Sequence, residues 1–453
     1  MIGSKRIAVL LLCVCISSWW SHEIRQRIRH GISMVDFGAI YYGARCVKQH
    51  KDPYDAKTFL QEFKAEGGSF PVNSTGSEVD PRIVTNCINL PTTLLLATPI
   101  AMLPRGAAQI LWIVLTTGLL AVAASFMWDL GANTAPAIWA CLAGFILANC
   151  EQLLVIGNVA GIAVSLCVVA AWCFLRERYA MVGVFLLAIS LVLKPQDAGF
   201  VWLYFLLTGG ELRRRALQTL AVVGILGLFA AIWIAPSSPH WIQELHRNLA
   251  VGSARGGVND PGLSGISSGN INQIVDLQAA LSVFRNDPRF YDPVSYLVDG
   301  FLILIWAFVA LTKRSAHESA SLAIAAISVL CLLPVYHRTY DAKLLLLTLP
   351  ACALLWKERG PRRWIALVLT SASILLTSDI PIAFLLVCTR NMSLSTSTVT
   401  GKVMTMILLR PIPLVLVATG CFYLWVYTHY NPLPTDLVRQ DDARKRTAIA
   451  AAK

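Results

Sequence analysis

The chain has 453 residues, of which 56% are hydrophobic and only 14% are charged. A soluble globular chain carries about 25% charged residues, so this composition excludes an ordinary soluble domain and predicts a membrane protein. The formal net charge is +12, but Lys and Arg stand in short clusters beside apolar runs, as the positive-inside bias predicts, and no nucleic-acid partner is expected.

The first expected element is a transmembrane helix at 7–20. It follows Lys5-Arg6 and lacks a small-x-small cleavage pattern behind it, so it reads as uncleaved. Further apolar runs lie at 88–103, 106–128, 136–149, 153–175, 178–193, 195–208, 216–235, 295–312, 319–335, 343–356, 363–388 and 402–430. A full span takes about 20 residues, and several of these runs are short. The pattern predicts an all-α polytopic membrane protein.

Short loops rich in Lys and Arg set the expected orientation, because such loops stay on the cytoplasmic side. They lie at 5–6, 176–178, 213–215, 313–314, 357–363 and 439–446. The long segments 21–87 and 236–294 are then expected outside. One weak run, 88–103 or 136–149, is expected to dip in without crossing, which leaves about twelve spans. Residues 1–430 form one expected domain, and 431–453 a cytoplasmic tail.

Most of the twelve cysteines lie in apolar runs, where they are small hydrophobic residues. No pair of Cys-x-x-Cys type is matched by a second pair, so a structural zinc site is not expected. Cys46 and Cys87 differ, because both lie in or beside the first long outer segment. A disulfide between them in an oxidising compartment is one alternative, and two free thiols are the other.

Asp36 is the first unusual polar residue, within Met34–Arg45. At helical spacing it lies with Ile40 and Gly43, which predicts a helix along the membrane surface with Asp36 projecting from it. The alternative is a helix N-terminal acid that complements the helix dipole.

More polar residues stand at the ends of apolar runs, on the side predicted to face outward. They are Glu151, Gln152, Asn158, Lys194 before Pro195, and the Tyr336–Lys343 turn with His337, Arg338, Tyr340 and Asp341. Lys194 alone is equally explained by snorkelling to the headgroups, and the late turn alone by solvation. Ionisable groups at membrane depth are costly and tend to be functional, so their convergence on one side predicts a site. Groups at headgroup level suit a substrate with a lipid tail and a charged phosphate.

The stretch Val35-Asp36-Phe37, Tyr41-Tyr42-Gly43-Ala44-Arg45 and Asp52-Pro53-Tyr54-Asp55 resembles the first outer loop of glycosyltransferase family 87 (DUF2029). Asn89–Thr92, Ile156–Val159, Leu193–Pro195 and Tyr336–Lys343 resemble further family motifs in the same order. The resemblance covers residues 30 to about 350. Asn158 and Thr92 depart from the Gln and Pro that the family pattern expects.

The resemblance implies a GT-C fold in the inner (plasma) membrane, with an active site facing the periplasm or exterior. It implies transfer of a hexose, expected to be mannose, with inversion, from a polyprenyl-phosphate donor to a lipid-linked or envelope glycan acceptor. The implied catalytic residues are Asp36, as base, and His337. The expected substrate-binding residues are Tyr41, Tyr42, Arg45, Gln152, Asn158, Lys194, Arg338, Tyr340 and Asp341. Lys194 and Arg338 would stabilise the phosphate leaving group. No metal or cofactor is expected.

Two alternatives remain open. A transporter or flippase of lipid-linked sugars would place its ionisable residues near the bilayer midplane on broken helices. A polymerase or ligase of lipid-linked glycans would also use long outer loops. The position of the polar residues at helix ends favours the glycosyltransferase.

Overall fold

The structure is a computed structural model. It describes residues 34–65, 86–131, 134–262, 273–313, 317–358, 360–379 and 397–430. The expected first helix at 7–20 and the expected tail at 431–453 lie outside the described residues.

The described chain is helical almost throughout. Its N-terminal part contains α2 (Val35–Lys48), α3 (Ala56–Ala65), α5 (Pro91–Ala101), α6 (Arg105–Gly131), α7 (Pro136–Ala148), α8 (Glu151–Ile156), α9 (Ala160–Leu175), α10 (Ala180–Leu193) and α11 (Pro195–Thr208). The remainder contains α12 (Gly210–Ile234), α13 (Trp241–Ser253), α14 (Leu277–Leu281), α15 (Pro288–Thr312), α16 (His317–Leu330), the 3-10 helix η3 (Asp341–Thr348), α17 (Leu349–Lys357), α18 (Pro361–Leu376), α20 (Val399–Leu409) and α21 (Pro411–His429). An isolated bridge pairs Ile274 with Arg338.

Five described stretches are long and apolar enough to cross a membrane: α6, the α7–α8 stretch Pro136–Ile156, α12, α15 and α21. Large apolar side chains cover the outside of α12 and α15, where Ile225 is 67% and Leu304 69% exposed. Apolar exposure on this scale is stable against lipid rather than water. The expected all-α membrane fold is confirmed. Further apolar helices of 10–17 residues are shorter than a full span, and the count of about twelve crossings stays a prediction.

The expected single run 402–430 is wrong in detail, because the structure divides it into α20 and α21 at Arg410. Arg410 has φ −135° and ψ 49°, outside the helical region. The ring of Pro411 clashes with a helical conformation of the residue before it. The run 153–175 is likewise divided, because Gly157 adopts φ +67° between α8 and α9. The run 363–388 begins with α18, and residues 380–388 lie outside the described part.

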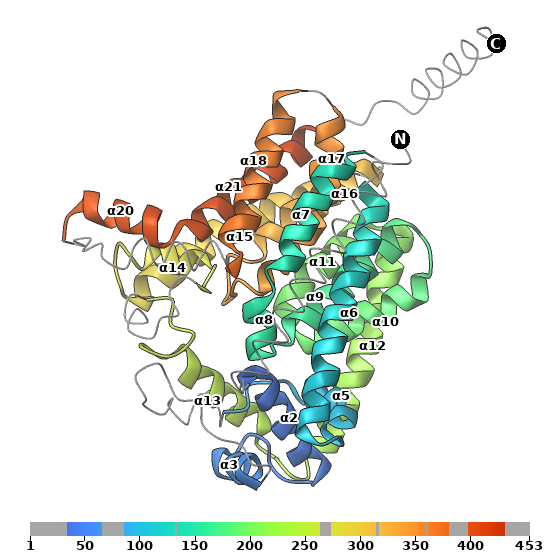
Figure 1. The fold of residues 1–453 in the computed structure, drawn as a ribbon, viewed down its shortest axis with the longest axis vertical. Helices are drawn as coiled ribbons and strands as arrows, with labels where there is room; N and C mark the ends of the chain where they lie inside the picture. The colour runs from blue at the N-terminus through green and yellow to red at the C-terminus, as the bar shows by residue number, and fades with distance from the viewer. Residues whose placement is uncertain are drawn as a thin grey trace.

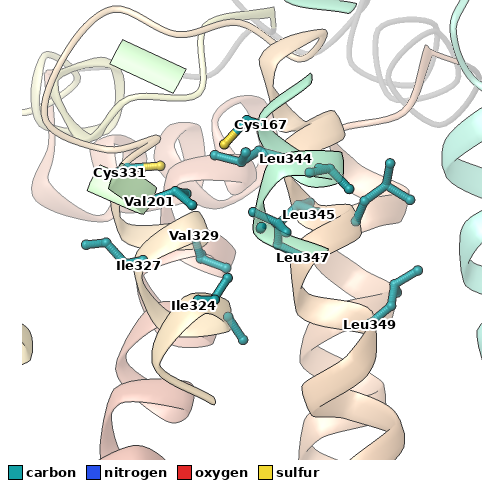
Figure 2. Close-up of a cluster of buried hydrophobic side chains, with 14 of the residues drawn as sticks. Cys167, Val201, Ile324, Ile327, Val329, Cys331, Leu344, Leu345, Leu347 and Leu349 are labelled. Atoms are coloured by element: carbon teal, nitrogen blue, oxygen red, sulfur yellow. The ribbon is translucent and has the colours of Figure 1, made fainter. Parts of the chain in front are cut away.

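The core is built around α9. All its residues except Ile162 and Leu175 are buried. Figure 2 shows part of this core, where Cys167 from α9 and Val201 from α11 lie with side chains of α16 and η3. A helix that is apolar all round is buried by its neighbours.

The helices are arranged between two ends of the molecule. In Figure 1, α2, α3 and α13 lie together at the lower end, and the α17–α18 pair lies at the upper end. The basic cluster 357–363 belongs to the α17–α18 connection. These three helices, from the segments expected outside, and the loop expected inside are therefore at opposite ends of the molecule.

Cys46 on α2 and Cys87 before α5 are both fully buried, free thiols. The sulfur of Cys87 lies against Gly43, one turn before Cys46: a Cβ built on Gly43 would be 3.2 Å from it. Burial raises the pKa of each thiol to about 12. The structure therefore has the second alternative drawn from the sequence, two free thiols.

Candidate functional site

Lys194 stands at a break that a proline imposes between α10 and α11. Its backbone is extended, with φ −153° and ψ 84°, since Pro195 disfavours a helical residue before it. Pro195 itself occupies the first position of α11, where a missing N–H costs nothing. This geometry places the carboxylate of Asp197, in the first turn of α11, 3.7 Å from the Lys194 ammonium.

The same ammonium joins α10 to the late turn. Lys194 donates a hydrogen bond to the carboxylate of Asp341, at the start of η3. The other Asp341 oxygen accepts the backbone N–H of Arg338 at 2.8 Å. Lys194 is 7% exposed and Asp341 is fully buried. Buried charges persist when they are paired in this way, and removing one partner is strongly destabilising.

His337 lies behind this pair and is fully buried. Its Nδ1 is 2.8 Å from the Val335 carbonyl, and its Nε2 is 3.3 Å from Asp197 Oδ1. Both ring nitrogens therefore face groups of the protein. When His337 is protonated, the two cations His337 and Lys194 balance the carboxylates of Asp197 and Asp341.

Arg338 connects the late turn to residues from the segment 236–294. Its guanidinium donates to the Tyr336 hydroxyl, to Gln273 Oε1 at 3.1 Å and to the Val258 carbonyl at 2.5 Å. Backbone bonds reinforce the connection: Val275 N donates to the His337 carbonyl at 3.0 Å. These bonds use three of the five guanidinium N–H groups.

Asp36 projects from the first turn of α2 and is partly exposed. Its Oδ2 accepts a hydrogen bond from Asn158 Nδ2 at 2.6 Å. Asn158 follows Gly157 at the break between α8 and α9. A residue expected to bind substrate therefore binds the expected base.

Asp36 also lies within electrostatic reach of both cations of the site. Burial raises its pKa, while the hydrogen bond from Asn158 and the positive charges of Arg338 and Lys194 oppose this rise. Tyr336 and Tyr340 also interact electrostatically with Asp36. The acid on α2, the lysine before its proline and the late turn thus interact electrostatically, and their meeting in one substrate pocket stays a prediction.

Three expected substrate-binding residues on α2 are engaged elsewhere. Tyr41 and Tyr42 are each 1% exposed. The Tyr41 hydroxyl donates to the Leu103 carbonyl at 2.9 Å, and Arg45 pairs with Glu62 of α3 at 2.9 Å. These contacts pack α2 against α3 and the end of α5.

Gln152 lies in the first turn of α8, and its backbone N–H donates to the Asp379 carboxylate at 3.1 Å. The buried ammonium of Lys343 donates to the Asn149 carbonyl at the end of α7. A carboxylate and an ammonium thus satisfy backbone groups left open at the α7–α8 break. Through α8, this break leads to Asn158.

The structure adds Asp197, Tyr336 and Gln273 to the residues expected from the sequence. Asp197 carried a signal, because a carboxylate one turn after Lys194 in an apolar run is costly unless paired. Tyr336 and Gln273 carried none, since a tyrosine and a glutamine in loops are ordinary surface residues.

The comparisons with known proteins agree with the sequence resemblance. Residues 88–275 match the model of glycosyltransferase family 87. The matched segment contains Asn158, Lys194 and Asp197, and it ends before the late turn. The search of curated proteins and the search of solved structures gave no match. The family match confirms the resemblance over this segment and indicates a membrane glycosyltransferase.

Proposed function

We propose that the protein is an inverting hexosyltransferase that uses a polyprenyl-phosphate sugar, expected to be mannose, as donor. The acceptor is a lipid-linked or envelope glycan, and the active site opens on the outer side of the plasma membrane. The supporting observation is a partly exposed carboxylate, Asp36, within electrostatic reach of two nearly buried cations, Arg338 and Lys194.

The cluster has the groups that this reaction needs. The acceptor hydroxyl oxygen attacks the anomeric carbon and its proton passes to Asp36, which acts as general base. The bond from the anomeric carbon to the phosphate oxygen breaks, and its electron pair stays on that oxygen. A preorganised cation beside this oxygen stabilises the developing charge.

Arg338 is the better of the two cations for direct contact with the phosphate. Two of its five N–H groups remain after its bonds to Tyr336, Gln273 and Val258, and guanidinium geometry suits phosphate oxygens. Lys194 is held between Asp341 and Asp197. In this role it contributes positive charge to the site without a direct contact to the phosphate.

The remaining site residues position Arg338 and Lys194 or hold the helices around them. His337 faces Asp197, Asp341 holds Lys194 and the Arg338 backbone, and the Tyr340 ring lies 5.0 Å from the Lys194 ammonium. Tyr41, Tyr42 and Arg45 hold α2, and Gln152 holds α8. In this proposal they act on the substrate through the residues that they position.

The test is sugar transfer by purified protein, using radiolabelled polyprenyl-phosphate mannose and a lipid extract from membranes that lack the protein. Replacing Asp36→Asn removes the base while it preserves size and hydrogen-bonding capacity. We expect the transfer rate to fall by about 10²- to 10⁴-fold, the usual contribution of a positioned base.

The matched control is Asp55→Asn, in the same outer segment. Asp55 caps the start of α3 through Thr58, and Asn caps helices equally well, so transfer is expected to continue at the unmodified rate. Full activity of Asp36→Asn would remove Asp36 as base. Failure of the unmodified protein with every polyprenyl-phosphate hexose would contradict the proposed donor class and favour a transporter of lipid-linked sugars.

A further inference from the structure

The amide of Asn158 is oriented by two hydrogen bonds of opposite kind. Its Oδ1 accepts the backbone N–H of Ala160 at 2.8 Å, and its Nδ2 donates to Asp36 Oδ2 at 2.6 Å. The reverse orientation would bring Oδ1 against a carboxylate and the amide NH₂ against another N–H, so both contacts would be repulsive. The start of α9 thus decides which end of Asn158 meets Asp36.

The chain leading into Asn158 is fixed against α2. Gly157 has φ +67°, and a Cβ there would lie 2.7 Å from Cβ of Phe37, the residue after Asp36. Trp112 Nε1 on α6 donates to the Gly157 carbonyl at 3.0 Å. The backbones therefore approach so closely that glycine is required, and the Asn158–Asp36 contact is held from three helices.

We propose that Asn158 is a positioning residue for the base: it holds Oδ2 of Asp36 and leaves Oδ1 to accept the proton of the acceptor hydroxyl. This inference rests on the proposed function, because it assumes that Asp36 is the base. The acceptor O–H bond breaks, the proton binds Oδ1, and the new glycosidic bond forms as the phosphate departs. Among the described residues, Asn158 is the hydrogen-bond donor to the carboxylate of Asp36.

The charged and titratable groups facing Asp36 come from two other parts of the fold. Lys194 comes from the end of α10, and Arg338, Tyr336 and Tyr340 come from the late turn. The two cations and the Asn158 hydrogen bond favour the charged carboxylate, and burial disfavours it. Removing the hydrogen bond therefore raises the Asp36 pKa. Because the base works when deprotonated, its acidic limb of activity then moves to higher pH.

The test is the pH dependence of kcat/KM for sugar transfer. Asn158→Ser keeps an oxygen that can still accept the Ala160 N–H, but its hydroxyl ends one bond short of the amide nitrogen that donates to Asp36. We expect kcat to fall about tenfold and the acidic limb to move upward by about one pH unit. Asn158→Asp keeps the acceptor and the shape while placing a second carboxylate beside Asp36, so its limb moves further in the same direction. If the serine variant does not fold, the aspartate variant carries the test.

Asn248→Ser is the matched control for a purely structural asparagine. Asn248 is buried, and within the described part of the chain it donates to the backbone carbonyls of Tyr54 and Cys87. Its replacement is expected to lower the melting temperature and leave the acidic limb in place. An unmoved limb in Asn158→Ser or in Asn158→Asp, or a raised KM with unchanged kcat, would overturn the positioning role. Full activity of Asp36→Asn would instead remove Asp36 as base, and failure of the unmodified protein with every polyprenyl-phosphate hexose would overturn the proposed function itself.

Discussion

Lys194 is a buried ammonium whose charge is balanced by neighbouring carboxylates. A lone ammonium buried between helices is unstable, and Asp341 and Asp197 offset its charge on two sides. Snorkelling to the headgroups, the alternative drawn from the sequence, does not describe a side chain that is 9% exposed and paired with a carboxylate. The stability of this region depends on the balance of charges more than on the lysine itself.

We therefore predict that Lys194→Met is more harmful alone than combined with Asp341→Asn. The single variant leaves Asp341 as an uncompensated buried carboxylate, which costs about 3–5 kcal/mol. In the double variant, the neutral Asn still accepts the Arg338 N–H, so most of this loss is recovered. The measurement is the melting temperature in detergent. Equal melting temperatures for the two variants would contradict the charge-balance explanation.

At the scale of helices, close approach depends on glycines whose missing side chain makes room for a neighbour. Gly161 is in the first turn of α9, and a Cβ there would lie 2.5 Å from the Thr116 methyl of α6 and 2.9 Å from Leu153 of α8. Gly224 on α12 has nothing within 4 Å. The two glycines are equivalent in sequence terms, and packing distinguishes them.

We predict that Gly161→Ala lowers the melting temperature while Gly224→Ala does not. Overpacking a tight contact costs about 1–3 kcal/mol, and the added methyl group at Gly161 would push α9 away from α6. At Gly224 the methyl group points into open space, and alanine favours a helix. Thermal unfolding of both variants in the same detergent is the measurement. A comparable loss at Gly224 would show that helix packing is not the cause.

At the scale of the whole molecule, the helix assembly has two ends with an apolar surface between them. One end holds α2, α3 and α13, and the other holds the connection between α17 and α18 with its basic cluster (Figure 1). Exposed apolar residues on α12 and α15 occupy the surface between them. The apolar surface is that of a membrane protein, and the positive-inside bias predicts that the α17–α18 connection is on the cytoplasmic side.

We predict that a cysteine at Ser253 is labelled by an impermeant maleimide in intact cells, whereas a cysteine at Glu177 is protected until the membrane is opened. Both positions are exposed. Ser253 ends α13, and Glu177 lies between α9 and α10 beside Arg176 and Arg178. The unmodified chain gives the background, and its buried Cys46 and Cys87 thiols are expected to stay unlabelled because their pKa is about 12. Reversed labelling of the two variants would contradict the orientation.

Local sequence patterns were enough to predict the membrane class, the helix break at Lys194 and the charged residues at helix ends. Hydropathy predicts the membrane class because it depends on composition over short windows. Pro195 marks the break at Lys194, because a proline restricts the residue before it whatever the fold. The charged residues at helix ends were visible for the same reason: their cost in an apolar run is a local property.

Only the tertiary structure decided which groups meet. Asn158 and Asp36 are 122 residues apart, and Lys194 and Asp341 are 147 apart, so no local period relates them. Tyr41, Tyr42 and Arg45 share α2 with Asp36, but helix rotation directs them into the packing with α3 and the end of α5. Which side chain of a helix reaches a site depends on the packing of that helix against its neighbours, and the local sequence does not specify this.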